Sequence, residues 1–188
     1  MEVWEDEVVF TIKCENVTAV VDGTRCQVAG HVVLKRYDPY GKMRTVVDTY
    51  IRHEEVLDYM TTYSGITREI ARTGMDLSTV TAFIAAAVRG YTLVTFDGRS
   101  VFSALRVQSF DVARHVELQE YFCRPDKTPY GLGPLLLALG YNFQPHRSSC
   151  AMLASFMMNL YFNDYRRTPT FEPRRPVLSA KEYARLLH

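Results

Sequence analysis

Three β-rich runs open the chain, and the turns between them limit how it can fold. The runs are Val8–Val21, Arg25–Arg36 and Met43–Ile51, and each is rich in β-branched side chains. Asp22-Gly23 separates the first two runs, and Asp38-Pro39-Tyr40-Gly41 separates the second from the third. Both are strong turn sequences, because Gly tolerates positive φ and Pro fixes φ at about −65°. The pattern therefore predicts an antiparallel three-stranded meander.

Helix and strand patterns alternate after the meander. Ser78–Arg89 predicts a helix that Ser78 can cap and Gly90 ends. The next predicted elements are a buried parallel strand at Thr92–Phe96, a helix at Gly98–Val107, and a short strand or extended segment at Gln108–Ala113 that ends at Asp111. They are followed by a helix at Leu132–Leu139 and a long Met- and aromatic-rich core helix at Ser148–Tyr165. This order predicts an α/β fold: a central mixed β-sheet, antiparallel in its first three strands, flanked by helices.

The length and composition favour one folded domain. The chain has 188 residues, of which 47% are hydrophobic, and this suffices for a full core. We interpret residues 1–165 as this domain and residues 166–188 as a basic C-terminal extension. Arg166–Pro176 is predicted to be an extended linker, and Ser179–Leu187 a short helix with Ser179 and Glu182 as its capping box.

Charge, hydropathy and cysteine spacing exclude several classes of protein. The net charge of +1 argues against a protein that coats nucleic acid uniformly. No apolar run approaches the about 20 residues that cross a bilayer, and the acidic N-terminus lacks a signal-peptide core. We therefore expect an intracellular protein, cytoplasmic or nuclear, without a membrane partner. The four cysteines lack C-x-x-C spacing and are predicted to be buried reduced thiols: Cys14, Cys26, Cys123 and Cys150.

The segment from Val47 to Thr67 carries the most specific pattern in the chain. It reads Val47-Asp48-Thr49-Tyr50-Ile51-Arg52 and then Leu57-Asp58-Tyr59-Met60-Thr61-Thr62-Tyr63-Ser64-Gly65-Ile66-Thr67. This sequence resembles the third strand and following loop of DEDDh-type 3′–5′ exonucleases, in the RNA-exonuclease and interferon-stimulated-exonuclease branch. Members of that branch read "Y-D-x-Y-V-R-P … V-x-D-Y-x-T-x-x-S-G-I-T". The resemblance implies the RNase H-like exonuclease fold for residues 8–165.

The loop within this segment has a structural interpretation. We expect a hydrogen-bonded turn that supports the sheet edge, in which Gly65 permits an unusual backbone angle. Direct contact with a substrate is the alternative. The residues concerned are Asp58, Tyr59, Thr61, Ser64 and Gly65.

The resemblance also locates the acids that would bind metal ions in the first strand. Two-metal exonucleases need several carboxylates that converge on one point. The family's first strand reads "D-C-E-M", and the corresponding sequence here is Lys13-Cys14-Glu15-Asn16. Residues two apart on a strand share a face, so both positions reach the same site. Glu15 is retained, whereas Lys13 stands in place of the first Asp.

The second acid is also replaced. The family's "G-H-x-x-x-N-D-F-x-x-L" motif corresponds to Thr95–Leu105, where Phe102 and Leu105 keep the packing positions and Val101 takes the acid position. Asp97 lies four residues before Val101 and is an alternative carboxylate that could face the site.

The last motif, "H-S-S-x-E-D-A", places Ser148 at the general-base His and Leu153 at the metal-binding Asp. A slipped alignment would restore a histidine, His146, but no aspartate, because residues 147–161 contain no acid. The family's "D-T" aspartate corresponds to Asp111, for which we expect structural hydrogen bonds.

Charge shows the consequence of these replacements. The charges of four site carboxylates would sum to −4, whereas the charges of Lys13 and Glu15 sum to zero. An ammonium group where a cation should bind repels that cation by several kcal/mol in a partly dry site. We therefore expect no metal site and no small-molecule cofactor; Mg²⁺ or Mn²⁺ would be needed only if displaced acids support activity.

Three functions follow from the resemblance and the replaced acids. The leading hypothesis is a catalytically inactive exonuclease-like domain that acts as a protein-interaction or scaffold subunit in an RNA-processing or RNA-decay assembly, with protein partners and RNA as a further partner. The second is an active metal-dependent 3′–5′ RNA exonuclease with displaced acids, using Glu15 and His146. The third is a non-catalytic RNA-binding module, whose candidate contacts are Arg99, Arg106, Arg166 and Arg167.

Overall fold

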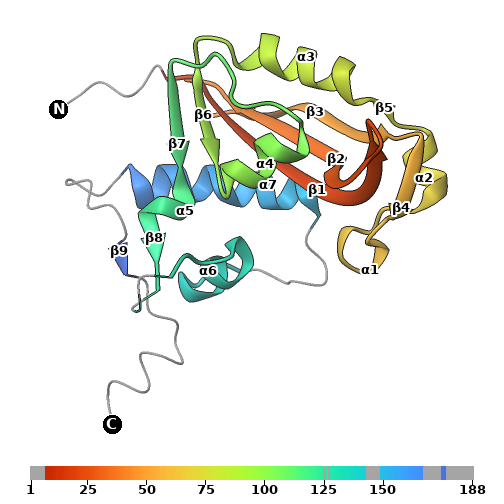
Figure 1. Ribbon diagram of the computed structural model, residues 1–188. Coiled ribbons are helices and arrows are strands. Elements are labelled where there is room, and N and C mark those ends of the chain that lie inside the picture. Colours follow the sequence, from red (N-terminus) through yellow and green to blue (C-terminus); the bar gives the residue numbers. More distant parts are fainter. Residues whose placement is uncertain (1–6, 125, 127, 143–148, 167–174, 177–188) are drawn as a thin grey trace.

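The computed structural model describes residues 7–124, 126, 128–142, 149–166 and 175–176, and its centre is a mixed β-sheet (Figure 1). The strand order is β5-β3-β2-β1-β6-β7, and β4 pairs with β1. The strands are β1 (Val9–Val21), β2 (Thr24–Tyr37), β3 (Met43–Arg52), β4 (Glu55–Asp58), β5 (Met75–Asp76), β6 (Thr92–Thr95) and β7 (Arg114–Glu117).

The predicted meander is confirmed. β1 pairs antiparallel with β2 from Val9↔Tyr37 to Val21↔Thr24, and β2 pairs antiparallel with β3. Asp22 and Gly23 join β1 to β2 with φ angles of 51° and 73°. A two-residue loop with positive φ at both positions matches the right-handed twist of the paired strands.

The sheet continues beyond β1 with parallel strands. β6 pairs parallel with β1 and with β7, as predicted for the buried run that begins at Thr92. Of the two alternatives predicted for Gln108–Ala113, a short strand or an extended segment, the strand is wrong, because the strand beside β6 is Arg114–Glu117. The preceding helix α4 (Gly98–Ala104) is shorter than predicted and is followed by Arg106 at φ 58°. The apolar residues after it pack on the helical layer instead of pairing with the sheet.

Helices cover both faces of the sheet (Figure 1). The face that carries Phe10 and Ile12 packs against α3 (Leu77–Val88) and α4. The opposite face packs against α7 (Cys150–Asn159) and the π-helix η2 (Leu160–Tyr165). Alternate residues of β1 therefore belong to two separate cores, as the strand period of two requires.

Helix boundaries differ from the prediction at their first residues. The predicted cap Ser78 is wrong: Asp76 precedes α3, no side chain caps it, and Ser78 lies inside the first turn. The long C-terminal helix begins at Cys150, because the Ser149 side chain accepts a hydrogen bond from the Met152 N–H. Short elements that were not predicted are α1 (Thr61–Ser64), α2 (Arg68–Arg72), α5 (Leu118–Tyr121) and the pair β8 (Phe122–Cys123) and β9 (Arg175–Pro176).

The remaining predictions concern termini and cysteines. α6 spans Leu132–Ala138, close to its predicted range, and the predicted helix Ser179–Leu187 lies outside the described residues. All four cysteines are free; three are buried, whereas Cys26 is half-buried, so its predicted burial is only partial. In the described part of the chain, no helix is long and apolar enough to cross a membrane.

Candidate functional site

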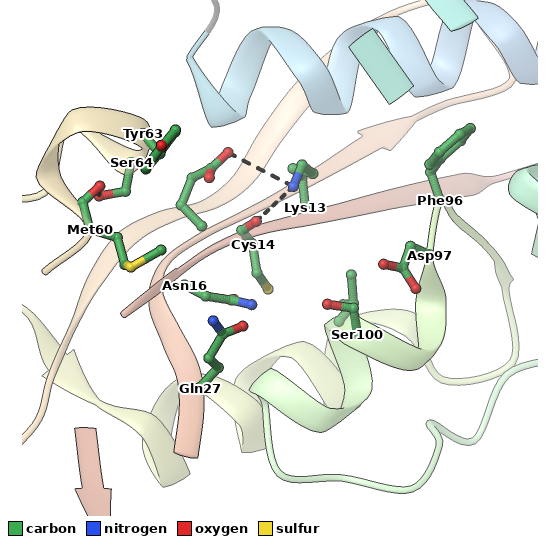
Figure 2. A pocket seen from close by; sticks show the side chains of 12 residues that line it. Lys13, Cys14, Asn16, Gln27, Met60, Tyr63, Ser64, Phe96, Asp97 and Ser100 are labelled. Carbon is green, nitrogen blue, oxygen red and sulfur yellow. Dashed lines mark hydrogen bonds and ion pairs between the residues drawn. The ribbon is translucent and has the colours of Figure 1, made fainter. Parts of the chain in front are cut away.

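A cavity of about 210 Å³ lies where β1, the α1 turn and the junction between β6 and α4 meet (Figure 2). Its walls therefore come from three segments that are distant in sequence. The lining residues are Lys13, Cys14, Glu15, Asn16, Gln27, Met60, Tyr63, Ser64, Phe96, Asp97, Ser100 and Val101.

β1 supplies the ion pair of the cavity. The Lys13 ammonium donates a 2.8 Å hydrogen bond to the Cys14 carbonyl oxygen and lies 3.8 Å from Glu15 Oε1. The two side chains are 23% and 25% exposed, so solvent only partly screens the pair. Lys13 thus neutralises the charge of Glu15.

Helix α7 is fixed directly against this part of β1. The Thr11 hydroxyl donates to the Ala154 carbonyl oxygen at 3.0 Å, and the Cys150 thiol donates to the Lys13 carbonyl oxygen at 3.3 Å. Burial raises the pKa of the Cys14 thiol to about 12 and also raises that of Cys150. Both thiols therefore remain protonated in the folded protein at neutral pH and are poor nucleophiles.

A second pair of polar side chains lies beside Glu15 on the next strand. Glu15 is opposite His31 in the β1–β2 register, immediately before a β-bulge. His31 Nε2 is 2.7 Å from Asp48 Oδ1, and its ring stacks on Tyr50 at 4.4 Å between centroids. Glu15 therefore has the Lys13 ammonium on its own strand and an imidazole on the neighbouring strand.

The wall opposite β1 is formed by the left-handed turn at Asp97. Asp97 has φ 60° and precedes the first residue of α4. Figure 2 shows the Asp97 carboxylate and the Ser100 hydroxyl directed toward the cavity from this side. A non-glycine residue in this conformation is strained and needs surrounding contacts to hold it.

Glu117 supplies those contacts, and the sequence interpretation missed it. Its carboxylate accepts hydrogen bonds from the N–H groups of Asp97 at 3.0 Å, Gly98 and Gln119, and from the Thr95 hydroxyl at 2.8 Å. Because Thr95 donates its single hydroxyl hydrogen to Glu117, His115 Nε2, at 2.7 Å, donates to Thr95.

The structural hydrogen bonds expected of Asp111 are therefore made by Glu117. The Asp111 side chain is 82% exposed and lies 3.6 Å from Arg89 Nε. The physical reason is that β7 begins at Arg114, which leaves Asp111 in the loop before the strand. The position of Glu117 directly before Leu118, at the end of a strand-like run, is the signal that could have found it.

Two of the positions that the resemblance aligns with metal-binding acids carry apolar side chains. Val101 is 5% exposed and packs in the core between the sheet and α3, while it also lines the cavity. Leu153 is half-buried, packs against the core on the α7 face and does not line the cavity. Ser148 and His146 lie outside the described residues.

The predicted structural loop is a hydrogen-bonded turn in the structure. The Ser64 hydroxyl donates to the Tyr59 carbonyl oxygen at 2.9 Å and accepts from the Ile66 N–H at 3.0 Å. The Thr61 hydroxyl donates to the Ile66 carbonyl oxygen at 2.6 Å, and Asp58 accepts from the Met60 N–H at 2.8 Å. Gly65 has φ 70°. The turn thereby holds Met60 and Tyr63 at the cavity wall, with Tyr63 85% exposed.

The candidate RNA-contacting arginines lie in separate surroundings. Arg106 forms an ion pair with Asp22 at 2.9 Å. Arg166 lies 4.0 Å from Glu7 and packs over the ring of Phe162. Arg99 is exposed and lines a second cleft of about 770 Å³, which shares Asp97 with the first cavity. Arg167 lies outside the described residues.

The cavity does not fit the two divalent cations that the resemblance implies. Of the residues described, no three His, Cys, Asp or Glu side chains are grouped so that they could hold a metal ion. The carboxylates that line the cavity are Glu15 and Asp97, and Lys13 lies among them. The donor set therefore combines two acids with one competing cation, where two-metal chemistry needs several converging acids.

Comparison by sequence finds no related family. No protein-family model matches the chain, and no curated protein matches it.

Comparison by structure finds Pan2 modules. The apo pseudoubiquitin hydrolase–RNA exonuclease module of Saccharomyces cerevisiae Pan2 superposes with a TM-score of 0.67 and 18% identity over 89% of this chain. The same module in complex with AACCAA RNA superposes with a TM-score of 0.65 and 17% identity over 89% of this chain. The Neurospora crassa Pan2 catalytic unit superposes with a TM-score of 0.61 and 17% identity over 86% of this chain. The chain spans 28% to 31% of the length of these structures. The likeness confirms the predicted exonuclease-like fold.

Proposed function

We propose that this chain is a catalytically inactive exonuclease-like domain that acts as a protein-interaction or scaffold subunit in an RNA-processing or RNA-decay assembly. The observation that carries the proposal is the Lys13 ammonium, 3.8 Å from Glu15 in the cavity. The exonuclease-like fold and its likeness to Pan2 support the RNA-related setting.

Electrostatics argues against metal-dependent hydrolysis at this cavity. At 4 Å and an effective dielectric constant of about 20, a unit charge repels a like charge by about 4 kcal/mol, and a divalent cation by about twice that. The hydrogen bond to the Cys14 carbonyl oxygen holds the ammonium close to β1. A cation beside Glu15 would therefore have to displace Lys13 from two contacts.

The exposed aromatic rings support the interaction role. Tyr63 and Tyr40 are 85% and 89% exposed, and both lie on turns held by hydrogen bonds. Tyr is enriched among the residues that dominate protein–protein binding energy, because its rigid ring buries a large area at small cost in conformational entropy. The α1 turn therefore presents one such residue beside the cavity.

A nuclease assay tests the catalytic half of the proposal. The purified chain is incubated with end-labelled single-stranded RNA and DNA in Mg²⁺ or Mn²⁺, and the products are resolved by length. We expect wild-type protein and Glu15→Ala to leave the substrates equally intact. Stepwise 3′ trimming that Glu15→Ala abolishes would contradict the proposal and favour an active enzyme that uses displaced acids.

Affinity purification tests the interaction half. Proteins that co-purify with the tagged chain are reconstituted one by one with wild-type protein and with Tyr63→Ala. We expect at least one direct partner, and we expect the substitution to weaken it by about tenfold or more, the effect of losing a strongly contributing interface residue. The absence of any direct protein partner would contradict the scaffold role.

A non-catalytic RNA-binding module is the second candidate, and the cleft that contains Arg99 favours it. Gln119 also lines this cleft; its side-chain NH₂ donates one hydrogen to the Tyr130 carbonyl oxygen and has a second to donate to a phosphate or base oxygen. RNA affinity that falls steeply with salt and weakens in Arg99→Ala would support this function. Salt-insensitive capture of a protein partner without RNA affinity would support the scaffold.

A further inference from the structure

Lys13 has an unusual position among the residues that line the cavity. Of the described lining residues, Lys13 alone has a basic side chain, whereas Glu15 and Asp97 are acidic. Its Nζ atom is anchored by the 2.8 Å hydrogen bond to the Cys14 carbonyl oxygen and faces Glu15 at 3.8 Å. Figure 2 shows both contacts as dashed lines at the cavity wall, with Asp97 across from Lys13.

The backbone at Lys13 is held independently of its side chain. The Cys150 thiol donates to the Lys13 carbonyl oxygen, and the Thr11 hydroxyl donates to the Ala154 carbonyl oxygen. β1 also pairs with β2 at Lys13 itself, opposite Val33, and with β6 up to Thr11. A substitution at position 13 therefore changes the charge in the cavity while the strand keeps its place against α7.

We infer that Lys13 is a tethered counter-ion. Its ammonium group supplies the positive charge that a divalent cation would otherwise supply to Glu15, and it thereby prevents divalent cations from binding in the cavity. This inference rests on the proposed function, because it explains how an exonuclease-like site keeps its shape without a metal.

A second consequence concerns the single substitution Lys13→Asp. Positions 13 and 15 lie on the same face of β1, and Asp97 faces them across the cavity. Three carboxylates would then line one cavity, which suits the oxygen preference of Mg²⁺ and Mn²⁺. Lys13 is therefore the specificity-determining residue that excludes a divalent cation from this cavity.

The test is Mn²⁺ binding by the full chain, measured by the loss of the free-Mn²⁺ electron paramagnetic resonance signal and by Mn²⁺-dependent thermal stabilisation. We expect wild-type protein to show neither effect. Lys13→Asp is expected to bind Mn²⁺ at least about tenfold more tightly than wild type, and Lys13→Met, which only removes the repulsion, is expected to fall between them.

Lys35→Asp is the matched control, because Lys35 is a half-buried strand lysine on β2 that does not line the cavity. It makes the same change of charge and is expected to bind Mn²⁺ as wild type does. The inference is overturned if wild-type protein binds Mn²⁺ as tightly as Lys13→Asp does. It is also overturned if Lys13→Asp increases the affinity for Mn²⁺ no more than Lys35→Asp does. If Lys13→Asp fails to fold, the inference is overturned by a Lys13→Met protein that binds Mn²⁺ no more tightly than wild type.

These outcomes are distinct from those that test the proposed function. Mn²⁺ binding by wild-type protein without RNA trimming would overturn the counter-ion role and leave the inactive scaffold standing. RNA trimming by wild-type protein would overturn the proposed function itself.

Discussion

The carboxylate of Glu117 accepts a hydrogen bond of 3.0 Å from the backbone N–H of Asp97, which links the end of β7 to the turn that follows β6. The same carboxylate also receives the Gly98 N–H at the start of α4. One side chain therefore holds the left-handed residue that forms a wall of the cavity.

Glu117→Gln is expected to lower the free energy of unfolding by about 1–3 kcal/mol. The amide keeps one acceptor oxygen, but its NH₂ group faces backbone N–H donors and leaves them unsatisfied. Urea unfolding monitored by circular dichroism measures the change. The control Glu120→Gln alters an exposed side chain nearby and is expected to stay within about 0.5 kcal/mol of wild type. Equal stability of both variants would mean that the Asp97 turn holds without Glu117.

Val101→Asp is expected to destabilise the fold by about 3–5 kcal/mol. Val101 is 5% exposed in the core beneath α3, so an aspartate there would replace buried apolar contacts with a carboxylate that has lost most of its hydration. The control Ser100→Asp places the same acid on the exposed neighbouring residue in the first turn of α4. Thermal and urea unfolding compare the two. A stable Val101→Asp protein would show that the fold accepts an acid at this position.

Gly65→Ala is expected to cost about 1 kcal/mol of stability. The residue has φ 70°, and no heavy atom lies within 4 Å of a Cβ built there, so the cost is conformational and not a steric clash with neighbours. The control Gly131→Ala tests a glycine with φ −76°, which any residue adopts, and should be closer to neutral. If both substitutions cost the same, the left-handed turn is not what requires glycine at position 65.

Cys14 is expected to make stability depend on pH in the alkaline range. Burial raises the pKa of its thiol from 9.0 to about 12, so the unfolded thiol ionises first. The stabilising contribution is fully present below pH 9 and is lost as the pH rises toward about 12, at up to about 1.4 kcal/mol per pH unit.

Urea unfolding between neutral pH and pH 10 measures this slope. Cys14→Ala is expected to flatten it, whereas Cys26→Ala, which removes the half-buried thiol of β2, serves as the matched control. An unchanged slope in Cys14→Ala would place the alkaline loss of stability elsewhere, for example at Tyr161, whose pKa burial also raises.

Local patterns predicted the meander and the buried parallel strand well. The turn at Asp22-Gly23 and the alternation along β1 depend on residues that are neighbours in sequence, so the sequence contains the whole signal. The error at Gln108–Ala113 has a different origin. Those residues are apolar enough for a strand, but the early end of α4 directs their side chains to the helical layer, and only Arg114–Glu117 reaches β6. Pairing with a distant strand overrode local propensity.

By itself, the sequence determined the strand meander and the identity of the residues at the positions that the resemblance aligns with acids, above all Lys13 and Val101. Only the tertiary structure decided which polar groups meet. It placed β6 beside β1, brought Asp97 across from Glu15, and gave Glu117 the supporting role expected of Asp111. The reason is that convergence depends on the order of strands in the sheet, a long-range property that neither periodicity nor turn chemistry encodes.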